Sequence, residues 1–198
     1  MKNMALHIMD IVQNSIRAQA GLIQITIEET DPGLASVNIA DDGSGMTKEV
    51  LAKVSDPFYT SRTTRRVGLG IPLFRQSAEQ AGGNFSVNST QGSGTVVNAT
   101  FYKHHPDMVP WGDIPGVIIL MVAANPTTDF VYLHRTPKGE YLFDTREIKE
   151  QLDGVPINEH EVRRFLRNML AENLTAIGAA GVLRMKTIKD KANNEPNN

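Results

Sequence analysis

The first pattern with chemical potential is Asp10-Ile-Val-Gln-Asn14, which places a carboxylate and a carboxamide four residues apart. On a helix these two positions share a face, so both side chains point the same way. Oxygen ligands of this kind suit Mg²⁺, which binds one or two protein oxygens together with substrate phosphates. The ordinary alternative is a solvated helix face.

A second pattern, Asp41-Asp42-Gly43-Ser44-Gly45, directly follows a predicted strand. Its glycines permit positive φ and close approach of the backbone to a flat ligand, and a buried carboxylate here can accept a hydrogen bond from an exocyclic amine. A calcium loop is the competing interpretation, but the regular ligand spacing and the distal glutamate are missing. A simple turn rich in Asp and Gly also fits.

The third pattern is Asp56 to Gly70, DPFYTSRTTRRVGLG, which combines three arginines with Gly68-Leu69-Gly70 before a predicted helix. Free N–H groups and the dipole at a helix N-terminus favour phosphate, and arginines attract anions. A flexible basic surface loop is the alternative. A fourth pattern, Gly92-Ser-Gly94-Thr95, is explained by a hairpin turn, with a hydroxyl that could reach a ligand.

The elements that must position these patterns precede residue 104. Alternation and helical periodicity predict helices over 4–19, 48–54 and 72–80 and strands over 22–28, 36–40, 85–89 and 95–102. The predicted fold class is α+β, a two-layer α/β sandwich with helices on one face of a mostly antiparallel, mixed sheet.

The pattern changes after Pro106. We expect a buried strand over 117–123, a hairpin of strands 129–134 and 140–143, a helix over 146–152, and a last helix opened by an N-cap pair of Asn158 and Glu161. The predicted division is therefore a domain over 1–103, a smaller α/β extension over 104–186 that extends the sheet or docks a partner, and a disordered tail over 187–198.

Composition excludes several classes of protein. The chain has no cysteine, which rules out disulfides, zinc–thiolate sites and cysteine nucleophiles. Its net charge of −2 gives no overall basic surface for nucleic acid or an anionic membrane. The longest apolar run, 117–124, is far shorter than the roughly 20 residues of a membrane-spanning helix. We expect a cytoplasmic protein with no nucleic-acid or membrane partner.

Taken in order, the patterns resemble the histidine-kinase-like ATPase superfamily, over roughly residues 5–103. Asp10 to Asn14 is similar to its N box, Asp41 to Gly45 to its G1 box, Asp56 to Ser61 to the F box typical of histidine kinases, Gly68 to Ile71 to the end of its G2 box, and Gly92 to Thr95 to its last glycine motif.

This resemblance implies a Bergerat-type fold with ATP and Mg²⁺ as ligands. It implies that Asn14 coordinates Mg²⁺, that Asp41 binds the adenine amine, and that Asp10 is the catalytic carboxylate. The remaining residues implied to bind nucleotide are Gly43 and Gly45 around adenine, Thr95 on the adenine side, Gly68, Leu69 and Gly70 at the phosphates, and Phe58 and Arg66 in an ATP lid spanning 58–67.

Two residues depart from the family pattern. Asp10 stands where hydrolysing members have Glu, and its side chain is one methylene shorter, which limits its reach toward an attacking water. Arg66 stands where histidine kinases usually have a glycine, so it could contact the γ-phosphate or remain a solvated charge.

The resemblance implies three candidate functions. The leading one is a stand-alone protein kinase domain that transfers the γ-phosphoryl group to a protein supplied in trans. The others are an ATP-gated switch or ATPase of the MutL, Hsp90 and gyrase kind, and a nucleotide-dependent binding module like an anti-sigma factor. No phosphoacceptor-helix pattern precedes the N box, and the sequence leaves the oligomeric state open.

Overall fold

The computed structural model describes residues 3–30, 33–54 and 69–182. The helices are α1 (Met4–Arg17), α2 (Lys48–Leu51), α3 (Gly70–Gln80), α4 (Ile114–Ala124), α5 (Thr145–Gln151) and α6 (His160–Ala176). The strands are β1 (Leu22–Glu29), β2 (Leu34–Asp41), β3 (Phe85–Thr90), β4 (Gly94–Tyr102), β5 (Asp129–Thr136) and β6 (Gly139–Asp144).

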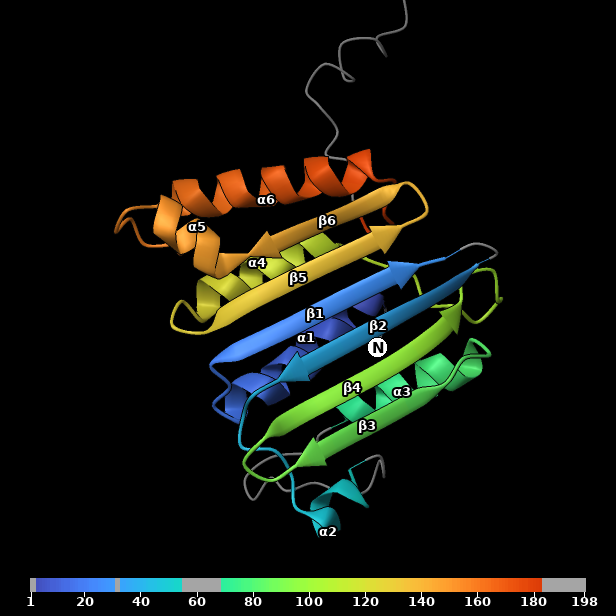
Figure 1. Ribbon diagram of the computed structural model, residues 1–198. Coiled ribbons are helices and arrows are strands. Elements are labelled where there is room, and N and C mark those ends of the chain that lie inside the picture. The colour runs from blue at the N-terminus through green and yellow to red at the C-terminus, as the bar shows by residue number, and fades with distance from the viewer. Residues whose placement is uncertain (1–2, 31–32, 55–68, 183–198) are drawn as a thin grey trace, which may run out of the picture.

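The strands form one six-stranded sheet in the order β3-β4-β2-β1-β5-β6. Among these strands the β1–β5 pair is parallel, and the other four pairs are antiparallel. Figure 1 shows α1, α3 and α4 behind the sheet and α6 beside β6. The predicted two-layer sandwich with a mostly antiparallel, mixed sheet is confirmed.

Alternation of apolar residues sets which face of the sheet is buried. Ile23, Ile25 and Ile27 of β1 are at most 1% exposed, and they belong to the same core as Ile8 and Val12 of α1. Residues between them, such as the exposed Gln24, face the other side of the sheet. Because successive side chains of a strand point to opposite faces, one face packs on the helices and the other remains open.

The C-terminal part of the chain continues this sheet. β5 pairs with β1 from Leu22↔Asp129 to Glu28↔Arg135, and α4 packs against α1. Of the two expected roles for the region after residue 103, extension of the sheet is therefore observed. The predicted tail over 187–198 lies outside the described residues.

One expected element is wrong. Residues 117–123, predicted as a buried strand, belong to helix α4. Asp113 caps this helix by accepting a hydrogen bond from the Gly116 amide at 2.9 Å, and Pro115 lies in its first turn. A run of apolar residues has no helical or strand period of its own, so the cap and the proline carry the signal that distinguishes the two.

The start of α6 also differs from expectation. Its N-cap is Glu159, whose side chain accepts a hydrogen bond from the His160 amide, rather than Asn158. Leu166, Leu170 and Leu174 of α6 are buried in the core, whereas Phe165 is exposed.

A buried polar network joins the C-terminal segment to β1. Glu29 Oε1 lies 2.9 Å from His134 Nε2 and accepts a hydrogen bond from the Ala180 amide at 2.7 Å, and Tyr132 Oη lies 2.6 Å from His134 Nδ1. Burial acts to raise the pKa of Glu29, but the hydrogen bonds from His134 and the Ala180 amide, with the charge of Lys103, outweigh it, so the pKa lies below its ordinary value. The sequence offered no signal for this role of His134.

The buried His7 leads us to predict that the stability of the folded chain depends on pH. Its ring is fully buried against Phe74, with Nε2 2.9 Å from Ser77 Oγ, and burial lowers its pKa from 6.5 to about 4. Between these values the unfolded chain binds a proton that the folded chain does not, so stability falls as pH drops from 6.5 toward 4. We expect a loss of about 2 kcal/mol between about pH 7 and about pH 4.5.

Urea unfolding of the wild type and of His7→Gln measures this contribution. Gln keeps a polar group for Ser77 and does not titrate, and acidic groups such as Glu29 contribute equally in both proteins. The difference in pH slope therefore belongs to His7. Identical slopes in the two proteins would contradict a buried neutral imidazole.

Candidate functional site

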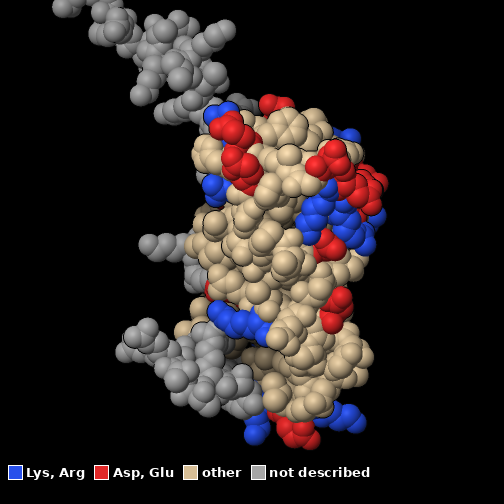
Figure 2. Space-filling view, turned by 90° about the vertical axis from the view of Figure 1, so that its left-hand side faces the viewer, with Lys and Arg blue, Asp and Glu red and all other residues tan. Residues whose placement is uncertain are grey.

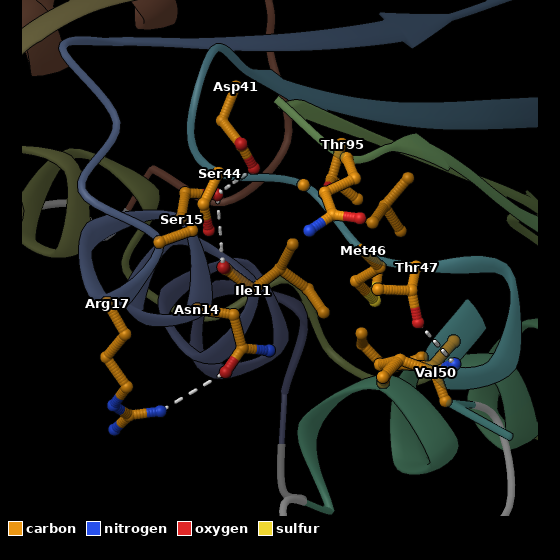
Figure 3. A pocket seen from close by; sticks show the side chains of 16 residues that line it. Ile11, Asn14, Ser15, Arg17, Asp41, Ser44, Met46, Thr47, Val50 and Thr95 are labelled. Atoms are coloured by element: carbon orange, nitrogen blue, oxygen red, sulfur yellow. Dashed lines mark hydrogen bonds between the residues drawn. The ribbon is translucent and has the colours of Figure 1, made fainter. Parts of the chain in front are cut away.

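A cavity lined by four of the predicted site residues, Asn14, Asp41, Gly45 and Thr95, lies at the end of the sheet where β2 ends and β4 begins. Its volume is about 480 Å³. Residues from α1, β2, β4 and the loop after β2 line it (Figure 3). Figure 2 looks onto this end of the sheet and shows mostly uncharged surface between separate groups of charged side chains.

Sheet register brings Asp41 and Thr95 together. They are directly opposed partners in the antiparallel β2–β4 pair, and both line the cavity. Thr95 Oγ1 lies 2.9 Å from Ser89 Oγ, and Ser89 Oγ accepts a hydrogen bond from the Met46 amide. These contacts through the Ser89 hydroxyl hold the loop after β2 against the start of β4.

The Asp41 carboxylate is held by two donors. Ser15 Oγ, from α1, donates to Oδ2 at 2.6 Å, and the Gly43 amide donates to Oδ1 at 3.0 Å. Each carboxylate oxygen can accept more than one hydrogen bond, so acceptor capacity remains on the cavity side. Ser15 is a site residue that the motif analysis did not single out, because its role depends on α1 packing beneath the end of β2.

The neighbouring carboxylate, Asp42, has a different role. Its Oδ1 accepts hydrogen bonds from the amides of Gly21 and Leu22 at 2.8 and 2.9 Å, which ties the end of β2 to the start of β1. Asp42 is exposed and is not among the residues that line the cavity. Of the two adjacent acids, Asp42 therefore has a structural role, and Asp41 lines the cavity.

The glycines of the loop after β2 are required by the protein's own packing. Gly45 has φ +62°, and a Cβ there would lie 2.0 Å from the Thr90 carbonyl oxygen. A Cβ on Gly43 would lie 2.8 Å from both the Cβ and the carbonyl oxygen of Ala18. Glycine at these positions lets the loop close against α1 and the β3–β4 turn, and so shapes the cavity indirectly.

Asn14 lies at the other end of the cavity. Its Oδ1 accepts a hydrogen bond from Arg17 at 3.2 Å, and both residues line the cavity (Figure 3). Asp10 precedes Asn14 by one helical turn and lies beside the start of α3, where a Cβ on Gly70 would be 3.1 Å from Asp10 Cβ. Asp10 and Gly70 are next to each other but do not line the described cavity.

The remaining predicted site residues divide into two groups. Leu69 is exposed and occupies the N-cap of α3 without a side-chain capping bond. Phe58, Arg66, Gly68 and the predicted lid over 58–67 lie outside the described residues.

Apolar side chains form much of the cavity wall. These residues are Ile11, Met46, Val50, Val54, Ile71 and Val97. Periodicity alone did not mark them, because an apolar residue that faces a cavity has the same pattern as one that faces the core. A slot with apolar walls and a carboxylate acceptor suits a flat heterocycle that bears an exocyclic amine.

A metal cage built from protein alone is not found in the described parts of the chain, where no three His, Cys, Asp or Glu side chains converge. The Asn14 carboxamide oxygen is the type of ligand that Mg²⁺ accepts, but it needs further oxygens from phosphates and water. The same described ranges contain no helix with the length and apolar character to cross a bilayer.

Comparison with known proteins gives consistent matches. The family model described as "Histidine kinase-, DNA gyrase B-, and HSP90-like ATPase" matches residues 3–105. Sporulation kinase E of Bacillus subtilis (strain 168) is 33% identical over 93 residues, which are 46% of this chain and 12% of that protein. Sensor histidine kinase ZraS of Klebsiella oxytoca is 30% identical over 97 residues, 48% of this chain and 20% of that protein.

The chain thus spans a fifth or less of the length of these two relatives, and it matches them over about half of its own length. A solved structure, the N-terminal domain of a DNA repair protein, aligns with a TM-score of 0.52 at 16% identity and covers 93% of this chain and 59% of that chain. At this identity the likeness concerns the fold alone, and it includes the C-terminal strands.

Proposed function

This chain belongs to the family of histidine kinase-, DNA gyrase B- and HSP90-like ATPases, and from that premise we propose that it binds Mg-ATP in the cavity and transfers the γ-phosphoryl group to a separate protein. The observation that carries the nucleotide assignment is the Asp41 carboxylate, held by Ser15 and Gly43 and opposed to Thr95 within an apolar slot. The kinase assignment is favoured by the relatives, both of which are named as kinases.

In this proposal Asp41 accepts a hydrogen bond from the adenine amine, and the apolar wall holds the adenine ring. Asn14 contributes an oxygen to Mg²⁺, which supplies charge neutralisation for the phosphates when it is bound. Arg17 lies close enough to Asn14 to hold its carboxamide oriented. Asp10 stays beside the start of α3, where a carboxylate can order water near the phosphates.

The transfer step replaces one bond to phosphorus with another. A nucleophilic side chain of the partner protein forms a bond to the γ-phosphorus, the bond to the β–γ bridging oxygen breaks, and ADP leaves with the electron pair. The chain's own contribution is positioning and charge stabilisation, which dominate phosphoryl transfer.

Radiolabelled ATP tests the transfer. The purified chain is incubated with cytoplasmic proteins of its native host and ATP labelled on the γ-phosphate, with ATP labelled on the α-phosphate as the control. We expect the γ-label alone to appear on a distinct protein, and to disappear with Asp41→Asn. Release of label only as free phosphate would favour an ATPase, and nucleotide binding without either reaction would favour a binding module.

The metal role of Asn14 predicts a specific loss. Asn14→Ala removes the oxygen and should weaken ATP binding about tenfold in the presence of Mg²⁺, with little effect when Mg²⁺ is chelated. Because Asn14 is half-buried on the surface of α1, unfolding stability should change little. Calorimetric titration with and without Mg²⁺ measures both affinities, and Gln13→Ala, one position earlier on α1, is the control. Equal losses of ATP affinity with and without Mg²⁺ would mean that Asn14 does not act through the metal.

A further inference from the structure

Helix α4 has an apolar outer face that the described residues leave partly exposed. Its eleven residues, IPGVIILMVAA, include no charged side chain. A helix that is apolar all round is normally buried on every side. Ile118, Met121 and Val122 are buried in the core, but Leu120 is 56% exposed.

A groove lies on each side of the exposed Leu120 side chain. The groove between α4 and α6 has a volume of about 690 Å³ and includes Val117, Leu120 and Ala123. The groove between α1 and α4 has a volume of about 390 Å³ and includes Met9, Ile16 and Leu120. Two hollows that share a central leucine can accept the side chains of a docked helix at i, i+3 and i+4 spacing.

The rims of both grooves are positively charged. Arg163, Arg164 and Arg167 of α6 line the larger groove, and Arg17 lines the smaller one. Arg164 pairs with Glu161, and Arg167 pairs with Asp113 at 2.7 Å. Within the described part of the chain, Arg163 makes no ion pair. Within the same part, the side chain of Arg17 donates only to the neutral side chains of Asn14 and Gln13.

The charge balance at this surface is therefore opposite in sign to that of the whole chain, which has a net charge of −2. The only carboxylate that lines either groove among the described residues, Asp113, is already neutralised by Arg167. A partner with acidic side chains on both sides of an apolar stripe would meet Arg163 on one rim and Arg17 on the other.

We propose that the outer face of α4, with the grooves on its two sides, docks an acidic amphipathic helix of a separate protein. A second copy of this chain is disfavoured because a symmetric contact brings the same cationic rims together. A bilayer is disfavoured because lipid meets a convex apolar surface, whereas hollows require side chains to fill them. The surface shares only Arg17 with the cavity, and its test needs no nucleotide.

The test uses a fluorescent synthetic helix of about 18 residues with a leucine stripe flanked by Glu, and a second peptide in which Gln replaces every Glu. Fluorescence anisotropy with the full chain should show binding of the Glu peptide about tenfold tighter than the Gln peptide, weakening with salt. Leu120→Gln and Arg163→Gln should each weaken the Glu peptide about tenfold.

Matched variants separate docking from general effects. Leu142 is 52% exposed on β6 and lines none of the described cavities, and Arg75 is an exposed arginine on α3. Leu142→Gln and Arg75→Gln should leave binding unchanged, and unfolding curves should show all four variants folded.

Three results would overturn the proposal. The first is equal affinity for the Glu and Gln peptides, or equal effects of Leu120→Gln and Leu142→Gln. The second is a dimer of the chain in analytical ultracentrifugation that Leu120→Gln dissolves, which would assign the surface to a second copy. The third is Leu120-dependent binding to phosphatidylglycerol vesicles without peptide binding, which would assign it to lipid.

Discussion

Replacing Asp41 with Asn should reduce ATP affinity by about 100-fold while leaving the fold intact. The Asn Oδ1 can still accept from the Gly43 amide, and the Asn NH₂ group takes the place of Oδ2, where the Ser15 hydroxyl can rotate to accept from it. The cavity then presents a donor to the adenine amine, which is itself a donor. The same logic predicts that wild-type protein binds ATP and ADP much better than GTP.

Calorimetric titration measures these affinities, and Asp42→Asn is the matched control. Asp42 is the adjacent carboxylate but supports the start of β1 outside the cavity, so its replacement should change stability more than nucleotide affinity. Equal affinity for GTP and ATP, or equal loss of ATP affinity in the two variants, would refute the role of Asp41 in reading the base.

Gly45→Ala should strongly destabilise the protein. The new Cβ would lie 2.0 Å from the Thr90 carbonyl oxygen and 3.0 Å from that of Gly94, and both contacts are to backbone, which cannot rotate away. Gly45 also has φ +62°, which adds the cost of a left-handed conformation. We expect a loss of more than about 3 kcal/mol in the free energy of unfolding, together with loss of nucleotide binding.

Gly92→Ala is the control that separates the cost of crowding from the cost of the left-handed backbone conformation. Gly92 has φ +80°, but a Cβ there meets no atom within 4 Å. It should therefore cost only about 1 kcal/mol, the backbone contribution. Urea unfolding of the two variants gives the difference, and similar values for both would mean that the loop after β2 relaxes and that its packing against the β3–β4 turn does not shape the cavity.

Much of the fold was predictable because local and tertiary preferences agree. The alternation of isoleucines over 22–28 marks a strand with one buried face, and that strand is β1. The prediction for α4 was wrong because its residues are apolar on every side, so their periodicity did not distinguish a helix from a strand. The cap at Asp113 was the signal for a helix, and the prediction did not take it into account. The same property that hid the helix, an apolar outer face, is the basis of the proposed docking surface.

The site was predictable in part for a related reason. Asp41, Gly45 and Thr95 belong to short local motifs, so the sequence alone identifies them. Their proximity depends on the β2–β4 register, and the contact of Ser15 with Asp41 spans 26 positions of sequence. Such long-range contacts are set by packing and leave no local pattern in the chain.

Hydrogen exchange measured with and without Mg-ATP tests most directly whether nucleotide occupies this cavity. We expect slower exchange in residues 41–47 and 89–95, which include the loop after β2 and the β3–β4 turn, and no change in the β5–β6 hairpin at the far edge of the sheet. Protection confined to β5, β6 or α6, or unchanged exchange under conditions where ATP is bound, would contradict the assignment.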